Sequence, residues 1–384
     1  MKIAIMSHVA STAAPTGAER VIDLLARGLN NRGHRVTVSA PGRWMLASGL
    51  LDAGVEVRSI PVRACWLVQW ANQPFWRQAF RFTRYVFPDR GVPALRSFVR
   101  DLEPDVVHVN CLPHLRGAAI AHACGRPVVW HIHEILPPGP RRRFFARRLR
   151  RDATRIVAVS EAVAWWLRDE GLDDLVEVVH NAIEPPAQLS NRAAAREMFG
   201  LPTKACVIGL FGQLVEHKGA LHFVHAAHRA ASSNSDLHYL IAGHGPRQFF
   251  RRLHREIVNG PARDRIHLVP PQKEIWSLLA AVDVVAITTL WPDPLPRVVM
   301  EAMAVGLPVA GYGGGGVPEM VVHGENGILS EPEDVDGLAA AFERLAGDAE
   351  LRRRMGEAGS LRARDLFTVQ GHVDRMEAVL ARVI

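Results

Sequence analysis

The chain has 384 residues, of which 48% are hydrophobic and 22% charged, and its formal net charge is +7. This composition excludes a disordered chain, and the length favours two domains that each bury their own core. The four cysteines form no CxxC pair and no run of 18 apolar residues occurs, which argues against a disulfide scaffold, a zinc ribbon or a membrane-spanning helix and favours a cytoplasmic protein.

The amino-terminal half predicts alternating strands and helices. Lys2–Met6 is a short apolar strand, too brief for the core of a signal peptide. After a polar turn with Pro15 and Gly17, apolar residues recur at helical spacing over residues 21–29, and Gly33 marks the end of that helix. Further β-branched strands are expected at residues 35–39, 105–109 and 155–159.

The alternation restarts after a polar stretch at residues 183–191. Strands are expected at residues 205–211, 237–242, 265–269 and 282–287, with helices between them. Such alternation predicts parallel sheets, and therefore an α/β protein with two Rossmann-like domains and a ligand-binding crevice between them. We expect domains at residues 1–185 and 186–365, and a C-terminal helix at residues 366–384 that packs back on the first domain.

The positive charge is concentrated in the first half of the chain. Residues 1–185 hold 25 Lys and Arg against 17 Asp and Glu, a net charge of +8, whereas residues 186–384 hold 21 against 22, a net charge of −1. A basic domain is typical of proteins that face an anionic partner such as a membrane surface, a phosphorylated lipid or nucleic acid. We favour the membrane surface over nucleic acid, which places the protein at the inner face of the cell membrane.

Two segments interrupt the strand and helix pattern. Residues 66–87 hold 8 of the chain's 26 aromatic residues, which predicts either an inserted helical pair with a small core or an apolar acceptor site that dips into a membrane. Residues 141–155 hold eight arginines and one acid, Asp152. As a helix, this segment would be basic on most faces, either as a solvated surface or as a binding surface for phosphate or membrane, and we expect residues 141–151 to meet an anionic membrane.

Several common catalytic motifs are missing. No glycine-rich dinucleotide fingerprint, Walker motif or nucleophile elbow occurs. His131 and His133 have the spacing of a metal pair but lack a nearby third ligand, so no metal site is expected. Asp334 and Asp336 have a DxD spacing, but they precede a periodic apolar run and are interpreted as a helix N-terminus.

The second half of the chain holds several separate sequence features that are typical of a ligand-binding site. Gly212 and Gln213 end a strand, and Lys218 opens the next helix, where a cation and helix N–H groups would meet an anion. Gly243 lies where a further strand runs into a glycine turn. Asp293 and Glu301 are two carboxylates eight residues apart, and residues 311–316 form a glycine loop that backbone atoms of a ligand site can approach closely. Pro296 suits the first position of the helix that carries Glu301.

The ordered set resembles the retaining glycosyltransferases of family 4, which have the two-domain GT-B architecture. Residues 17–20 (GAER) resemble that family's amino-terminal glycine loop, and residues 127–134 resemble the strand that ends in its active-site histidine, here His133. Residues 157–161 and 180–184 resemble further landmarks of the family. Its E-x7-E motif falls on Asp293 and Glu301.

This resemblance implies metal-independent transfer of a sugar from a nucleotide-diphosphate sugar to a glycan or lipid-linked acceptor, with no cofactor. Asp293 would hold sugar hydroxyls, Glu301 the ribose diol, and His133 the sugar or the acceptor. Lys218 and the helix start at Arg297 and Val298 would stabilise the departing diphosphate. The glycines at 17, 212 and 243, with Gln213 and Pro296, complete the expected binding set.

Three positions depart from the family pattern. The first motif carboxylate is the shorter Asp293, Pro296 replaces the usual glycine and removes a backbone donor, and Gln213 replaces a phosphate-binding arginine. The guanidinium of Arg297 is one candidate to supply the missing charge; the alternative is that Arg297 faces solvent or pairs with an acid. Two other functions stay open: a membrane-associated binding or scaffold protein without turnover, and a sugar-nucleotide epimerase.

Overall fold

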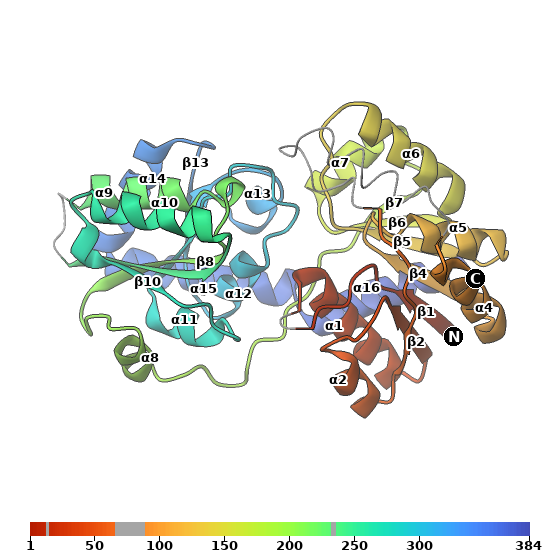
Figure 1. Cartoon of the computed structure of the whole chain (residues 1–384). Helices are drawn as coiled ribbons and strands as arrows, with labels where there is room; N and C mark the ends of the chain where they lie inside the picture. The colour runs from red at the N-terminus through yellow and green to blue at the C-terminus, as the bar shows by residue number, and fades with distance from the viewer. Residues whose placement is uncertain (13–14, 66–88, 232–235) are drawn as a thin grey trace. The chain divides into compact units, whose positions relative to one another are not determined.

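The computed structural model describes residues 1–12, 15–65, 89–231 and 236–384. The chain forms two compact units, of which unit 1 comprises Met1–Ala182 with Thr368–Ile384, and unit 2 comprises Ile183–Phe367. Both units appear in Figure 1. The aromatic segment at residues 66–87 lies outside the described residues. None of the helices in the described ranges combines the length and hydrophobicity that crossing a bilayer requires.

Unit 1 contains a seven-stranded parallel sheet in the order β3-β2-β1-β4-β5-β6-β7. Its strands are β1 (Lys2–Met6), β2 (Arg35–Ala40), β3 (Glu56–Ser59), β4 (Val106–Asn110), β5 (Val128–Ile132), β6 (Arg155–Ala158) and β7 (Val176–Val178). Its helices are α1 (Gly17–Asn31), α2 (Ala47–Asp52), α4 (Gly91–Leu102), α5 (Leu115–Ala123), α6 (Pro140–Asp152), α7 (Glu161–Asp169) and α16 (Val369–Ala381). The strand order reverses between β1 and β4, which makes that point the expected ligand crevice of the sheet.

The last helix of the chain, α16, completes the core of unit 1. Its apolar residues Val373, Met376 and Leu380 are buried in one cluster with the inward face of α1 and with β2. At the polar end of this contact, the ring of His34 lies 2.5 Å from the carboxylate of Glu377. Unit 1 is therefore built from both ends of the sequence.

Unit 2 contains a six-stranded parallel sheet in the order β10-β9-β8-β11-β12-β13. Its strands are β8 (Cys206–Gln213), β9 (Leu237–His244), β10 (Ile266–Val269), β11 (Val284–Ile287), β12 (Val309–Tyr312) and β13 (Gly327–Ser330). Its helical segments are α8 (Arg192–Met198), η2 (Glu216–Lys218), α9 (Ala220–Ala230), α10 (Arg247–Val258), η3 (Arg263–Arg265), α11 (Trp276–Ala281), α12 (Arg297–Ala304), α13 (Val317–Met320), α14 (Val335–Gly347) and α15 (Ala349–Leu366). Here the order reverses between β8 and β11.

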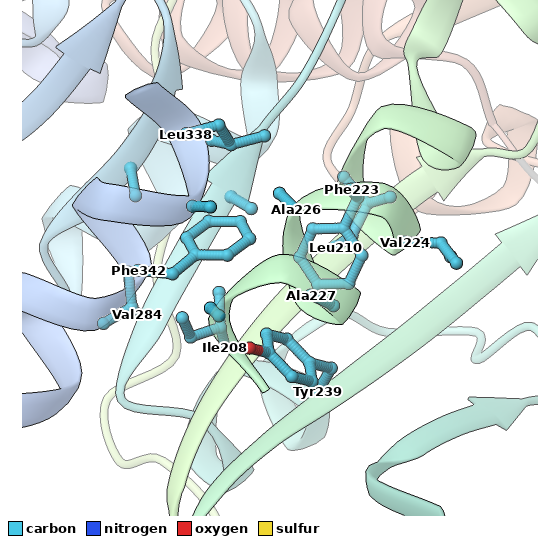
Figure 2. Packing of buried hydrophobic residues seen from close by; sticks show 14 of the residues in the cluster. Ile208, Leu210, Phe223, Val224, Ala226, Ala227, Tyr239, Val284, Leu338 and Phe342 are labelled. Carbon is cyan, nitrogen blue, oxygen red and sulfur yellow. The ribbon is translucent and has the colours of Figure 1, made fainter. Parts of the chain in front are cut away.

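The core of unit 2 covers one face of this sheet. Figure 2 shows Ile208 and Leu210 of β8 among Phe223 of α9, Tyr239 of β9 and Phe342 of α14. The rings of Phe223 and Phe342 lie 5.5 Å apart in an edge-to-face arrangement. Both sheets are parallel and carry helices between their strands, which confirms the predicted α/β class with two Rossmann-like domains.

Candidate functional site

The first group of predicted site residues gathers where the strand order of unit 2 reverses. Lys218 ends the short turn η2 that follows β8, and Asp293 lies in the loop that follows β11. The ammonium group of Lys218 lies 2.5 Å from a carboxylate oxygen of Asp293, although the two residues are 75 positions apart. The side chain of Lys218 is 33% exposed and that of Asp293 is 11% exposed. The sequence did not predict this pairing of the expected phosphate ligand with the expected sugar ligand.

Backbone contacts hold these two loops together. The hydroxyl of Thr288 donates to the Lys218 carbonyl at 2.9 Å, and the Leu290 N–H donates to the His217 carbonyl at 2.9 Å. Gly219 has a φ of +70°, and a Cβ there would lie 1.8 Å from the Thr288 carbonyl oxygen, so only glycine fits. The position of Lys218 is therefore fixed by the backbone and not by its ion pair alone.

The second carboxylate of the motif lies in the adjoining helix. Glu301 of α12 is 7% exposed, and the Nε of Arg297 donates to it at 2.7 Å. Nη1 of Arg297 is buried and has no hydrogen-bond partner among the described residues. Arg297 therefore pairs with an acid, as one of the two alternatives predicted. The expectation for Pro296 was wrong: Pro296 is the N-cap, and α12 begins one residue later, at Arg297.

The glycine loop approaches Asp293 through its backbone. The N–H of Gly316 donates to the Asp293 carbonyl at 2.8 Å. Gly315 has a φ of +62°, and a Cβ there would lie 2.3 Å from the same carbonyl oxygen. The loop between β12 and α13 therefore fixes the backbone of Asp293, while its side chain stays beside Lys218.

The remaining expected ligands of unit 2 lie at the end of β8. The predicted strand 205–211 extends to Gln213, because Gly212 and Gln213 pair with Gly243 and His244 of β9. A Cβ on Gly243 would lie 1.8 Å from the Gly212 carbonyl oxygen, so close strand pairing alone explains that glycine. Gln213 is exposed. Val298 lies in the first turn of α12, a helix that no side chain caps.

In unit 1, His133 lies just beyond the carboxyl end of β5. Its Nε2 is 3.0 Å from Oδ1 of Asn110, the last residue of β4. Nδ2 of Asn110 faces the Ala18 carbonyl at 3.4 Å, which leaves Oδ1 to accept and Nε2 of His133 to donate. Burial lowers the pKa of His133 to about 3, so the ring is neutral at physiological pH. The sequence analysis missed Asn110, although its place at the end of a strand beside the reversal point signals a site.

Glu134 is a second residue that the sequence analysis did not assign. One oxygen of its carboxylate accepts from the backbone N–H groups of His133 at 3.0 Å and Leu112 at 3.2 Å. These bonds join the ends of β4 and β5 around Cys111, a non-glycine residue with a φ of +68°. Burial raises the pKa of Glu134 to about 7, against the opposing effect of the two backbone donors.

Behind His133 lies a cluster of buried histidines. His108 of β4, His131 of β5 and His372 of α16 are at most 1% exposed. The rings of His131 and His133 have centroids 4.3 Å apart, and those of His131 and His372 lie 6.2 Å apart. Burial lowers the pKa of each of these four rings, to about 3 for His108 and about 4 for His372. The four rings are therefore uncharged at neutral pH and contribute to the packing of the interior of unit 1.

The glycine loop expected at residues 17–20 is organised by Glu19. Gly17 is the first residue of α1, and no atom would meet a Cβ there within 4 Å. The buried carboxylate of Glu19 accepts from the N–H and hydroxyl of Ser11 at 2.7 and 2.6 Å, the N–H of Thr16 at 2.7 Å and the indole N–H of Trp44 at 2.7 Å. These hydrogen bonds lower its pKa against the opposing effect of burial, which is the largest contribution. Glu19 therefore ties residues 11–16 to the start of α1.

Two other predicted features have clear outcomes. Asp334 is the N-cap of α14 and accepts from the Gly337 N–H at 2.9 Å, which confirms the helix start. Within the described ranges, no three His, Cys, Asp or Glu side chains are placed to hold a metal ion, and this includes His131 with its neighbours. The predicted residues thus form two ion pairs in unit 2, Lys218 with Asp293 and Arg297 with Glu301, while in unit 1 the predicted His133 pairs with Asn110.

The chain matches two protein-family models. The model described as Glycosyl transferases group 1 matches residues 191–362, and the model described as Glycosyltransferase Family 4 matches residues 15–185. Similar curated proteins include the 2-deoxystreptamine glucosyltransferase of Streptomyces kanamyceticus, 29% identical over 53% of this chain and 55% of that protein. The N-acetyl-alpha-D-glucosaminyl L-malate synthase of Bacillus anthracis is 31% identical over 39% and 38%. The chain spans about half or less of the length of these relatives.

Solved structures share the whole fold. The crystal structure of Anabaena HepE in complex with UDP-glucose has a TM-score of 0.82 and 23% identity, and the likeness covers 100% of both chains. The sucrose-phosphate synthase of Thermosynechococcus elongatus has a TM-score of 0.77 and 18% identity, over 99% of this chain and 98% of that one. The likeness to these structures confirms the expected fold.

Proposed function

Because a glycosyl transferase family model matches each half of this chain and its fold resembles that of sugar-transferase structures, we propose that it transfers a sugar from a nucleotide-diphosphate sugar to a glycan or lipid-linked acceptor. The observation that carries this proposal is the Lys218–Asp293 pair at the reversal point of the unit 2 sheet, in the loop that leads into α12 and Glu301. Ligands of doubly wound sheets bind at this point. The relatives named as transferases and the UDP-glucose complex of HepE support the same reaction class.

Lys218 is our candidate for the donor phosphates. A departing diphosphate gains charge in the transition state, and a positioned ammonium group stabilises that charge. Asp293 neutralises Lys218 at 2.5 Å. On donor binding, the phosphates would replace Asp293 as the partner of the Lys218 ammonium group. The carboxylate of Asp293 would then accept hydrogen bonds from sugar hydroxyls. The residues of the site thus avoid an uncompensated charge before the donor arrives.

Glu301 is our candidate for the ribose diol. A carboxylate accepts from two hydroxyls at once, and the hydrogen bond from Arg297 at 2.7 Å fixes the orientation of Glu301. The buried Nη1 of Arg297 still has a hydrogen atom to donate. We propose that it meets a phosphate or ribose oxygen of the donor and so supplies part of the charge missing at Gln213.

His133 would serve the reacting sugar as a hydrogen-bond acceptor. Oδ1 of Asn110 accepts a hydrogen bond from the Nε2–H of His133, which leaves the lone pair on Nδ1. A neutral ring of this tautomer can accept from a hydroxyl of the donor sugar or of the acceptor. It does not supply a positive charge, because burial keeps its pKa at about 3. Retention of anomeric configuration and transfer without a metal ion remain part of this proposal.

We further propose that the arginines at residues 141–151 bring unit 1 to an anionic membrane surface. Trp165 of α7 is 66% exposed and lies 5.9 Å from the guanidinium of Arg142, so an exposed aromatic ring accompanies the basic helix. Sedimentation with vesicles that contain phosphatidylglycerol tests this surface. Binding that rises with the anionic fraction and falls with salt supports it, and equal sedimentation with neutral vesicles contradicts it.

A panel assay tests the proposed reaction. The chain is incubated with UDP-, GDP- and ADP-sugars, and donor cleavage is followed by release of the nucleoside diphosphate. Cleavage of one donor that Glu301→Ala weakens supports the transferase. Binding of a nucleotide without cleavage or transfer favours the scaffold protein, and interconversion of two nucleotide sugars favours the epimerase.

A further inference from the structure

The arginines of α6 fall into two groups. Arg142 is buried and pairs with Asp169, the last residue of α7, and with Glu170, which follows it. Arg150 donates two hydrogen bonds, of 2.7 and 2.8 Å, to the carboxylate of Asp174. Arg148 and Arg151 share Asp152. Arg143 and Arg147 are exposed, and no carboxylate within the described ranges pairs with either of them. Most of the charge of the helix is therefore already compensated, and what remains is concentrated at these two positions.

Arg143 and Arg147 line a cavity. It has a volume of about 400 Å³ and lies between α6 and the turn that follows α7. Arg150 and Arg151 continue the same wall, and the buried side chains of Ala146 and Leu172 supply its apolar lining. Its one acidic lining residue, Glu170, lies 3.0 Å from Nε of Arg142, which compensates its charge. This volume falls in the range of small-molecule sites.

The arrangement favours a doubly charged anion. Arg143 and Arg147 are four residues apart, so their like charges face each other on one side of the helix and repel. An anion between the two guanidinium groups converts this repulsion into attraction. The planar fork of each arginine matches the oxygens of a phosphate group, and the adjacent Arg150 and Arg151 raise the local potential.

The cavity is separate from the candidate catalytic residues of unit 1. Asn110 and His133 lie at the carboxyl ends of β4 and β5. The residues that line the cavity belong to α6, from Arg143 in its first turn to Arg151 in its last, and to the turn after α7, and they include neither Asn110 nor His133. Both helices are visible in unit 1 in Figure 1.

We propose that this cavity binds a phosphomonoester or diphosphate group of a molecule other than the sugar donor, held by Arg143 and Arg147. The group belongs either to a soluble phosphorylated compound or to a lipid headgroup. The proposal does not rest on sugar transfer, because the residues of the cavity differ from those of the donor site.

Calorimetric titration of the full chain with inorganic pyrophosphate tests the proposal. The double variant Arg143→Gln/Arg147→Gln should bind pyrophosphate at this site roughly 10- to 100-fold more weakly, as expected for the loss of charge-assisted contacts. The matched control is Arg96→Gln/Arg100→Gln, a pair of exposed arginines with the same spacing on α4. Lys218→Gln removes the pyrophosphate contact expected in unit 2.

The outcomes separate the two sites and the two ligand sources. Binding that persists in Lys218→Gln and in the α4 control but is lost in the α6 variant supports the proposal. Equal binding by the α6 variant and its control, or complete loss in Lys218→Gln alone, overturns it. In a second arm, vesicles of phosphatidylcholine with phosphatidic acid identify a lipid headgroup if the wild type binds them and the α6 variant does not. Pyrophosphate binding without vesicle binding identifies a soluble ligand.

Discussion

The buried histidines behind His133 should make unit 1 sensitive to acid. Burial lowers the pKa of His108, His131 and His372 below the ordinary value of 6.5, so these rings stay neutral while the protein is folded. The unfolded chain binds a proton at each ring once the pH falls below 6.5. Above pH 6.5 the rings are neutral in both the folded and the unfolded state, so they do not change the free energy of unfolding. As the pH falls from 6.5 towards about 3, only the unfolded chain binds protons at these rings, and the free energy of unfolding decreases progressively.

The size of this effect follows from the three rings. At pH 5, an unfolded histidine with a pKa of 6.5 gains about 2 kcal/mol from protonation that a buried neutral ring cannot gain. Three such rings amount to about 6 kcal/mol, which is comparable with the whole stability of a typical domain. His133 adds to the effect in the same direction.

Urea unfolding followed by tryptophan fluorescence at pH 7.5 and pH 5.0 measures this loss. Proton uptake on unfolding at pH 5.0, obtained by calorimetry in buffers of different ionisation enthalpy, should fall by about one in His372→Gln. Free energies of unfolding that agree within about 1 kcal/mol at the two pH values would refute the reasoning.

Three substitutions test other parts of the structure. Glu19→Ala leaves buried donors around Ser11, Thr16 and Trp44 without an acceptor and should lower the free energy of unfolding by about 3 kcal/mol in urea titrations; a loss below about 1 kcal/mol would contradict that role. His133→Ala should lower kcat more than it weakens nucleotide binding, and near-normal turnover would make His133 merely structural. Arg297→Gln should reduce turnover, with partial recovery when Gln213→Arg is added, and normal turnover would leave Lys218 and the helix N–H groups to hold the phosphates.

The positions of the strands along the chain, and their alternation with helices, could be predicted because both depend on local sequence patterns. Short β-branched runs placed each of the predicted strands within one or two residues of its position in the structure. β8 is longer than predicted because Gly212 and Gln213 pair with β9, and a pairing between distant residues leaves no local signal. Pro296 lies before α12 because its ψ of 115° is extended, a choice that sequence alone does not decide.

The charged contacts could not be predicted for the same reason. Lys218 and Asp293 are 75 positions apart, and they meet only because β8 and β11 are neighbours in the sheet. From the sequence, Arg142 could not be distinguished from the other seven arginines of residues 141–155. It is buried because it pairs with Asp169 at the end of α7 and with Glu170 just after it. Asn110 and Glu134 lie at or just beyond the ends of β4 and β5, two adjacent strands of the sheet. Their proximity depends on the assembled sheet, so the sequence alone does not indicate that they belong to one site.

The central claim is that unit 2 binds the nucleotide-diphosphate part of a sugar donor through Glu301 and Lys218. Thermal shift with UDP, GDP and ADP measures it directly, because a ligand at about 100 times its Kd stabilises the folded protein by about 2.7 kcal/mol. One of the three nucleotides should raise the Tm of the wild type. Glu301→Ala should still fold, with a Tm lowered by the loss of its ion pair with Arg297, and should lose most of that shift. Absence of a shift with every nucleotide, or an unchanged shift in a folded Glu301→Ala variant, would contradict the account.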